Sequence, residues 1–296
     1  MPSDEDRTGG RGPGPGFITQ EEMRKTTDMP DKKFSYEEPQ EALSSRISAH
    51  LQYSDFNLHD WIKNRFVIAC GSKVLDLGCG NGNFTHLFWE CVRPDGTVIG
   101  LDKNAQVIMD AKKQNKGLPQ SLVKYFVQDY DRPFADLGMR FDWIFAIYSL
   151  YYTEDSARIL DITKKMLSSG GTFVVIGPAP QNVRDLTDFS RDLTKKDPDQ
   201  QHFGRIERIS KEFHPLFDQM FGKANVTYEE INSVMTFPDA RSFAEYYWST
   251  LLWRESIQGL SADKIGSLKA ETLKRASTLP ALQIKKQMSC LVGKAH

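Results

Sequence analysis

Five short apolar runs, rich in branched and aromatic residues, alternate with longer segments of helical period in the middle of the chain. The runs cover residues 73–77, 97–102, 122–128, 141–149 and 171–177, and the helical segments between them include residues 84–91, 105–113 and 157–167. This repeat predicts a parallel sheet, because parallel strands need long crossover connections and bury both of their faces. We therefore expect an α/β fold in which helices cover both faces of a doubly wound, mostly parallel sheet.

The segments on either side of this repeat predict an outer layer of helices. Residues 1–33 are rich in Gly, Pro and charge and are expected to be a disordered tail, whereas residues 34–70 have apolar residues at helical spacing and predict an N-terminal lid of two helices. The core is expected to comprise residues 71–180, 223–238 and 285–296, and the helical cap residues 181–222 and 239–284. Ligands bind at the carboxyl ends of the strands in open parallel sheets, so we expect the cap to cover that edge and to contact the substrate.

The composition favours chemistry on a small molecule. The chain has 38 Lys and Arg against 39 Asp and Glu, a net charge of −1, so no general field attracts it to a nucleic acid or a membrane surface. Its cysteines, Cys70, Cys79, Cys91 and Cys290, form no CxxC pair, which favours reduced thiols over a disulfide frame or a zinc site. With a polar amino terminus and no apolar run long enough to span a bilayer, we expect a cytoplasmic protein with no metal, nucleic-acid or membrane partner.

Three glycines on alternate positions follow the first apolar run, in "VLDLGCGNGNF". Glycine weakens strands and helices alike, so Gly78, Gly80 and Gly82 indicate a sharp backbone turn or a ligand that lies against bare backbone. A strand, a glycine-rich turn and a helix start in this order predict a nucleotide-like cofactor at the helix amino terminus. The dinucleotide fingerprint G-x-G-x-x-G would need glycine at position 83, which is Asn83, so NAD is the less favoured cofactor.

Acidic residues stand at or near the ends of three successive runs. Asp76, two residues before the first glycine, places negative charge beside the loop and favours a cationic ammonium or sulfonium ligand over a pyrophosphate. Asp102 ends the second run, where a carboxylate can accept hydrogen bonds from the hydroxyl groups of a ribose. Asp129 follows the third run, where it can accept from an adenine amino group, and Tyr130 beside it offers an aromatic ring.

The segments "VLDLGCGNG", "GLDKN", "FVQDYD", "FDWIFAIYSLYYTED" and "MLSSGGTFVVIG" together resemble, in order and spacing, the successive motifs of class I S-adenosylmethionine-dependent methyltransferases of the small-molecule, natural-product or quinone and sterol type. The resemblance covers residues 73–177. It implies a Rossmann-like core that binds S-adenosylmethionine and releases S-adenosylhomocysteine, with seven strands of which the last, here the segment ending near Val292, is antiparallel. In that family strands six and seven form a simple hairpin, whereas residues 238–284 separate the two candidates here, so either the hairpin carries a cap or the sixth strand is assigned wrongly.

This resemblance implies a cofactor site along the ends of the first four strands. The methionine part of the cofactor is expected at Asp76 and at the loop formed by Gly78, Cys79, Gly80, Asn81 and Gly82. The ribose is expected at Asp102 and Lys103, and the adenine at Gln128, Asp129 and Tyr130. Tyr148 and Ser149 are expected to flank the methyl group. Taken singly, an aspartate after a strand is often a helix cap and a tyrosine is often part of the packing. The joint order of these residues is what favours an enzyme.

The candidate catalytic residues are a histidine and several tyrosines. Methyl transfer is an in-line displacement on an already activated sulfonium, so alignment and the exclusion of water carry much of the barrier reduction and a general base is optional. His202 is suited to remove a proton near neutral pH, unless it is simply a surface histidine. Tyr152, with Tyr151, follows the fourth strand, where the resemblance places residues that face the methyl group. Tyr36 and Tyr53 lie on elements that could close over the cofactor, Tyr36 as a catalytic group and Tyr53 as a cofactor contact.

The stripe "SFAEYYWSTLLW", residues 242–253, is apolar on too many sides for a lone surface helix. One face is expected to pack in the core, and the rest to line an apolar acceptor pocket or to contact a second subunit of a homo-oligomer. We therefore predict a methyltransferase that acts on a small, apolar or aromatic acceptor, as in the tailoring of a secondary metabolite. The alternatives are a tRNA or protein methyltransferase, a non-catalytic subunit that binds S-adenosylmethionine and, least favoured, an NAD-dependent oxidoreductase.

Overall fold

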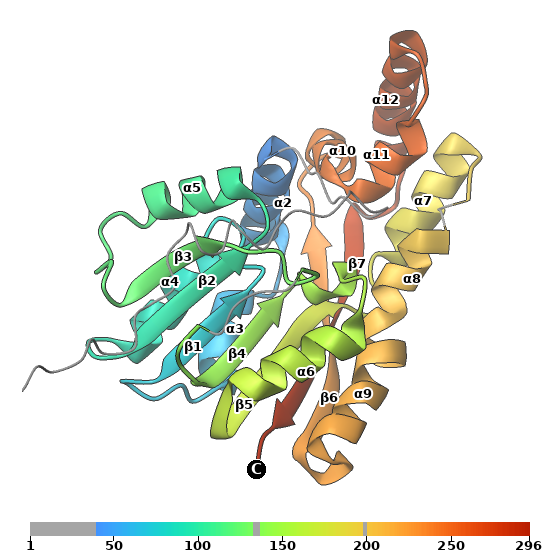
Figure 1. The fold of residues 1–296 in the computed structure, drawn as a ribbon. Helices are drawn as coiled ribbons and strands as arrows, with labels where there is room; N and C mark the ends of the chain where they lie inside the picture. The colour runs from blue at the N-terminus through green and yellow to red at the C-terminus, as the bar shows by residue number, and fades with distance from the viewer. Residues whose placement is uncertain (1–39, 133–136, 198–199) are drawn as a thin grey trace, which may run out of the picture.

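The computed structural model describes residues 40–132, 137–197 and 200–296, and it contains one seven-stranded sheet (Figure 1). The strands are β1 (Lys73–Leu77), β2 (Thr97–Asp102), β3 (Val123–Val127), β4 (Phe141–Ile147), β5 (Leu167–Pro178), β6 (Val226–Thr236) and β7 (Gln283–Lys294). Their order is β3-β2-β1-β4-β5-β7-β6, with β1 to β5 parallel and β7 antiparallel to both of its neighbours. The predicted doubly wound α/β sheet with an antiparallel last strand is confirmed. The expected tail, residues 1–33, and residues 34–39 of the expected lid lie outside the described residues.

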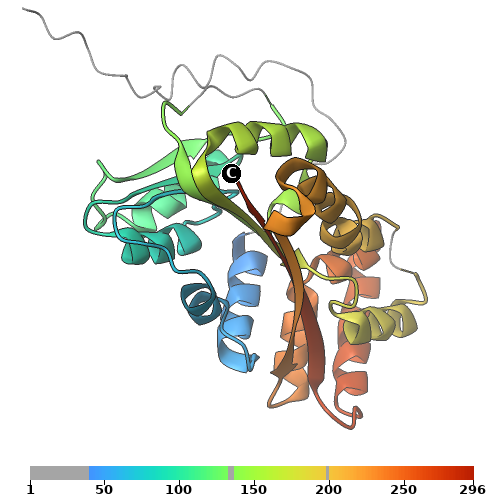
Figure 2. The ribbon, with the colours of Figure 1, turned by 90° about the horizontal axis from the view of Figure 1, so that it is seen from below.

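Helices cover both faces of the sheet (Figure 2). They are α2 (Gln40–Tyr53), α3 (Leu58–Arg65), α4 (Asn83–Val92), α5 (Ala105–Gln114), α6 (Ser156–Met166), α7 (Arg184–Thr194), α8 (Gln200–Arg208), α9 (His214–Phe221), α10 (Ala240–Ser249), α11 (Leu251–Ile257) and α12 (Ala262–Ala276). Residues of α6 and α9 pack on one face, and residues of α3, α4 and α5 pack on the other. Across the described ranges, no helix combines the length and the apolar character that crossing a bilayer requires.

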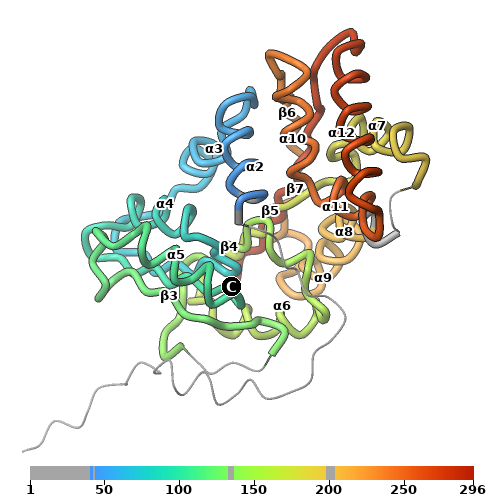
Figure 3. Tube along the Cα trace, turned by 90° about the horizontal axis from the view of Figure 1, so that it is seen from above, coloured from blue at the N-terminus to red at the C-terminus, as the bar shows by residue number. Residues whose placement is uncertain are grey.

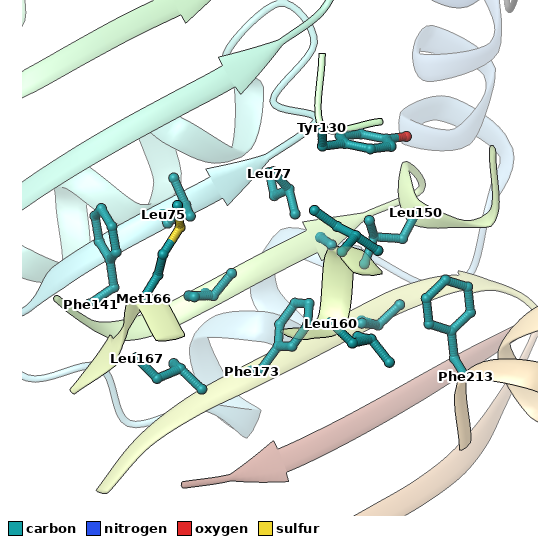
Figure 4. Packing of buried hydrophobic residues seen from close by; sticks show 14 of the residues in the cluster. Leu75, Leu77, Tyr130, Phe141, Leu150, Leu160, Met166, Leu167, Phe173 and Phe213 are labelled. Atoms are coloured by element: carbon teal, nitrogen blue, oxygen red, sulfur yellow. The ribbon is translucent and has the colours of Figure 1, made fainter. Parts of the chain in front are cut away.

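The parallel strands are apolar on both faces because both faces are buried. Leu75 and Leu77 of β1 lie in one cluster with Phe173 of β5 and Leu160 of α6 (Figure 4). Val74, one residue before Leu75, belongs to the cluster on the opposite face, as the period-two pattern of a strand requires. Near-continuous apolar runs of this kind are why the strands can be found from the sequence.

The β6–β7 hairpin carries the cap helices, which confirms the sixth strand assigned from the sequence. The two strands pair from Val226 opposite Gly293 to Thr236 opposite Gln283, and α10, α11 and α12 are inserted between them. These helices stand beside α7 and α2, as the view from above shows (Figure 3). The insertion therefore rises from the carboxyl edge of the parallel strands, where the cap was expected.

The aromatic stripe of residues 242–253 forms the core of this cap. Phe243, Tyr247 and Trp253 are each at most 3% exposed and lie in one cluster with residues of α2, α7 and α12. Trp248 is partly buried against the same cluster, and its Nε1 donates to Thr272 Oγ1 at 3.4 Å. The stripe is thus explained by packing within the chain on more than the one face expected.

Candidate functional site

The glycine-rich loop between β1 and α4 turns through three left-handed residues. Gly78, Gly80 and Gly82 have φ values of 78°, 54° and 79°, in the region that side chains disfavour. At Gly78 a Cβ atom would also lie 2.3 Å from Cβ of Ser149, which follows β4. Ser149 Oγ donates to the carbonyl oxygen of Leu77 at 2.7 Å, so the ends of β1 and β4 are held in contact. Backbone conformation therefore favours glycine at all three positions, and the close approach of Ser149 requires it at Gly78 as well.

Backbone amides of the loop join it to the end of β2. The amides of Gly78 and Cys79 donate to the carbonyl oxygen of Leu101 at 2.7 and 2.8 Å. The amide of Gly80 donates to Asp102 Oδ2 at 3.0 Å. Asp102 is half-buried, and burial raises the pKa of its carboxyl. Each carboxylate oxygen has two lone pairs, so Asp102 retains acceptor capacity for a ligand.

Asp76 is the most deeply buried acid of the site. It is 1% exposed and lies on the face of β1 that packs against α4, where Thr85 Oγ1 donates to its Oδ2 at 2.6 Å. Burial is the main cause that raises the pKa of Asp76 to about 7, and the Asp102 carboxylate adds to it. No cationic side chain among the described residues forms an ion pair with Asp76. A cationic ligand group would relieve the cost of ionising this carboxyl.

Thr85 is a residue of the site that the sequence analysis missed, because a threonine in the first turn of a helix carries no motif of its own. Cys79, expected in the site, is buried beside Asp76. Burial raises the pKa of its thiol well above the usual range, so it is a neutral packing group and not a nucleophile.

The ends of β2 and β3 bring a second group of polar residues together. The amide of Gln128 donates to the carbonyl oxygen of Asp102 at 2.8 Å, and Gln128 Nε2 donates to the carbonyl oxygen of Asp129 at 2.8 Å. Asp129 Oδ1 accepts from the amide of Asp131 at 2.9 Å, and its Oδ2 lies 4.0 Å from Nε of Arg132. The acids expected at the ribose and the adenine therefore share one edge of the sheet.

Tyr130, Lys103 and Asn81 differ in how much of each side chain a ligand could reach. The ring of Tyr130 is buried in the core next to Leu77 (Figure 4), and its hydroxyl donates to the carbonyl oxygen of Ser149 at 2.9 Å. That hydroxyl therefore ties the β3 end to the β4 end. Lys103 is exposed beside Asp102, and Asn81 is half-buried in the loop.

Tyr148 stands directly after β4 in a strained conformation. Its φ of 51° is in the left-handed region, which a bulky residue rarely adopts. Its amide donates to the carbonyl oxygen of Ile176 on β5 at 2.7 Å, and its side chain is 39% exposed. Strain of this kind persists where the surrounding structure enforces it, often in functional sites.

The structure describes the side chain of only one of the three catalytic candidates. Tyr36 lies outside the described residues, and His202 lies on α8 with a side chain that is not among the described ones. Tyr152 is in the 3₁₀ turn Leu150–Tyr152, with its ring centroid 4.4 Å from that of Tyr151. The Tyr151 ring packs over Gly177 of β5.

Arg208 of α8 holds this turn in place and was not found by the sequence analysis. It donates to the carbonyl oxygen of Tyr151 at 3.2 Å, to that of Thr153, and to Ser156 Oγ at 3.0 Å. Glu212 completes the group, 2.6 Å from Nε of Arg208. An arginine in a charged helical segment carries no sign in the sequence of such a role.

Tyr53, expected near the cofactor, belongs to the cap cluster. Its ring centroid lies 5.0 Å from that of Phe237.

Comparison with known proteins gives a consistent family. A family model described as a methyltransferase domain matches residues 68–220. The trans-aconitate 2-methyltransferase of Acidovorax sp. (strain JS42) is 29% identical over 186 residues, 60% of this chain and 67% of that protein. The demethylmenaquinone methyltransferase of Lactococcus lactis subsp. lactis (strain IL1403) is 26% identical over 178 residues, 60% of this chain and 64% of that protein.

Solved structures share the fold. The YcgJ protein of Bacillus subtilis superposes with a TM-score of 0.53 at 17% identity, over 80% of this chain and 97% of that one. A S-adenosylmethionine-dependent methyltransferase from Thiobacillus denitrificans, solved with S-adenosylhomocysteine, superposes with a TM-score of 0.51 at 16% identity, over 87% of this chain and 100% of that one.

Proposed function

Since the chain belongs to the methyltransferase-domain family and is a class I S-adenosylmethionine-dependent methyltransferase, we propose that it methylates a small molecule held between the carboxyl edge of the sheet and the helical cap. The observation that carries the placement of the cofactor is the buried Asp76 carboxyl beside the left-handed glycine loop. Bare backbone and an unneutralised acid fit the cationic amino-acid end of S-adenosylmethionine. The cap, inserted at the same edge, supports an acceptor site above it.

The remaining residues are proposed to bind the cofactor along the strand ends. Asp102 accepts from the ribose hydroxyls, and Gln128 with Asp129 binds the adenine. Tyr148 and Ser149 flank the methyl group, which the bound cofactor supplies in activated form on a sulfonium. The strain at Tyr148 supports this role, because it fixes a side chain at the end of β4. Tyr152 stays a candidate for contact with the acceptor, since Arg208 fixes its turn at this edge.

The names of the relatives support a small-molecule acceptor, since they act on trans-aconitate and on demethylmenaquinone. The net charge of −1 supports the same class over tRNA. The apolar or aromatic acceptor expected from residues 242–253 has less support, because the cap itself buries most of that stripe. A role in tailoring a secondary metabolite stays a prediction.

Calorimetric titration with S-adenosylmethionine, S-adenosylhomocysteine and NAD tests the site. We expect both adenosyl ligands to bind the wild type and NAD not to bind. Asp102→Asn is expected to weaken binding by roughly 10- to 150-fold, the loss of a charge-assisted hydrogen bond worth about 1.5 to 3 kcal/mol. Asp95→Asn is the matched control, because Asp95 is an exposed aspartate just before β2, at the opposite edge of the sheet. Unchanged affinity in Asp102→Asn, or binding of NAD, would contradict the proposed site.

A further inference from the structure

A cluster of basic side chains lies between the N-terminal helix, the cap and the last strand. Lys286 of β7 donates from Nζ to the hydroxyl oxygen of Tyr246 on α10 at 3.3 Å. The His50 ring of α2 meets the Tyr246 ring edge-on, with centroids 5.9 Å apart. Arg46, one turn earlier on α2, donates from Nη1 to the carbonyl oxygen of Ser249 at 2.8 Å. Two elements, α2 and β7, thus bring three basic side chains to the end of α10 that carries the Tyr246 phenol.

This cluster lies at the same edge of the sheet as the proposed methyl site. The pairing of β5 with β7 ends at Pro178 opposite Met288, so Lys286 is two residues beyond it, past the carboxyl end of β5. Lys286 shares the β7 face of Met288, which packs in one cluster with Ile147, the last residue of β4. Tyr148 follows Ile147 directly, and Tyr246 is close enough to help to raise the pKa of the Tyr148 hydroxyl.

The cluster is desolvated and contains no described counter-ion for its lysine. Burial, followed by the Arg46 guanidinium, lowers the pKa of Lys286 to about 7. Burial, followed by Lys286 and Arg46, lowers the pKa of His50 to about 3. Among the described residues no carboxylate lies within ion-pair distance of Lys286, and no acid contributes to either shift. A half-buried lysine without an anion is unfavourable, whereas an incoming anion would be attracted in such surroundings.

The position of Tyr148 makes the cluster relevant to the acceptor. Its side chain is 39% exposed, yet it is desolvated enough for the pKa of its hydroxyl to be raised. Tyr148 is therefore accessible to a ligand at the end of β4. Lys286 and Arg46 are likewise only partly exposed.

We propose that Lys286, Tyr246 and Arg46 bind a carboxylate group of the methyl acceptor, next to Tyr148. This inference rests on the proposed function, because it names the chemical class of the acceptor. The ammonium of Lys286 and the guanidinium of Arg46 supply the charge, and the Tyr246 hydroxyl supplies a further donor. His50 remains neutral and packs edge-on against the Tyr246 ring.

Titration calorimetry on the protein saturated with S-adenosylhomocysteine tests the site, with trans-aconitate, succinate and benzoate as probes. Succinamide and inorganic phosphate are the comparison ligands. We expect binding of a carboxylate probe to the wild type, weakened by about tenfold or more in Lys286→Met, as for loss of a charged donor. Lys285→Met is the matched control, because Lys285 is the adjacent, exposed lysine on the other face of β7. Its affinity is expected to equal that of the wild type. Tyr246→Phe, which keeps the ring and removes the donor, provides a second variant if Lys286→Met fails to fold.

Proton uptake provides an independent readout. An anion beside Lys286 favours its charged form, so carboxylate binding at pH 8 is expected to take up a proton in the wild type and not in Lys286→Met. The inference is overturned if none of the three carboxylates binds, if both lysine variants bind equally, or if succinamide or phosphate binds as well as the carboxylates. Two separate titrations of the wild type distinguish the two proposals. Failure of S-adenosylhomocysteine to bind would count against the cofactor site alone, and carboxylate binding is then measured without it.

Discussion

Replacing Asp76 by asparagine is expected to stabilise the ligand-free protein at neutral and alkaline pH while weakening S-adenosylmethionine binding. The Asp76 carboxyl is 1% exposed, and burial raises its pKa from 3.8 to about 7. Asparagine has the same shape and can still accept the hydrogen bond from Thr85, but it has no charge whose burial costs free energy. The cationic ligand loses its counter-ion in the same variant, so its affinity falls.

The size of the stability effect follows from the pKa shift of Asp76. In the unfolded chain this aspartate ionises near pH 3.8, whereas in the folded protein it keeps its proton until about pH 7. Between these values the unfolded chain binds fewer protons, so stability falls as pH rises, and the loss is complete above pH 7. Of the change from pH 5 to pH 8, only the interval up to the folded pKa of about 7 contributes, at about 1.36 kcal/mol for each pH unit. The free energy of unfolding of the wild type is therefore expected to fall by about 2.7 kcal/mol more than that of Asp76→Asn.

Urea unfolding of the ligand-free proteins at pH 5 and pH 8, followed by circular dichroism, measures this difference. The exposed Asp95→Asn serves as the control for a change of net charge. The quantity compared is the difference in free energy of unfolding between the wild type and Asp76→Asn. A change in this difference of less than about 0.5 kcal/mol between the two pH values, which is the usual effect of a surface substitution, would refute the assigned pKa shift. Calorimetry at pH 8 is expected to show S-adenosylmethionine affinity lowered by about tenfold or more in Asp76→Asn.

Four further substitutions test the architecture around the site. Gly78→Ala is expected to lower the free energy of unfolding in urea by roughly 2 to 5 kcal/mol, because it adds left-handed strain and a contact with Ser149. Gly80→Ala adds only the strain, since nothing lies within 4 Å of its Cβ, and is expected to cost about 1 to 2 kcal/mol. Equal losses in the two variants would contradict the close approach at Gly78. Trp253→Ala is expected to lower the free energy of unfolding by about 3 to 5 kcal/mol, because Trp253 lies in the cap core, and a loss below about 1 kcal/mol would place it outside that core. Arg208→Ala is expected to lower stability by about 1.5 to 3 kcal/mol and to reduce kcat/KM without changing S-adenosylhomocysteine affinity, and an unchanged kcat/KM would remove its positioning role.

The sequence predicts most of the fold because the decisive signals are local. Residues 73–77 and 97–102 were assigned with the same bounds as β1 and β2, since apolar runs between turns mark buried parallel strands. The prediction misses the start of β5, because its helical segment extends to residue 167 and its apolar run begins only at residue 171. In the structure β5 begins at Leu167, and an irregularity in its pairing with β4 beside the left-handed Gly170 accommodates these residues within the strand.

The candidate site divides in the same way between local and non-local signals. Asp76, Asp102 and Asp129 could be grouped from the sequence, because the carboxyl ends of parallel strands meet at one edge. Lys286 and Tyr246 could not be grouped, because their contact depends on how the cap packs against β7 and not on any spacing along the chain. Sequence periodicity describes one element at a time, whereas such a cluster depends on several.

The β6–β7 hairpin makes the cap a separable module. Because Thr236 pairs with Gln283, the insertion leaves and re-enters the sheet at neighbouring points of one ladder, about 5 Å apart. A two-residue turn could close that ladder without moving a strand. The strands and helices around the glycine loop are therefore connected along the chain to helices α10, α11 and α12 only through β6 and β7. Exchange of this one insertion between related chains would therefore replace the cap, Tyr246 included, while the cofactor-binding half stays the same.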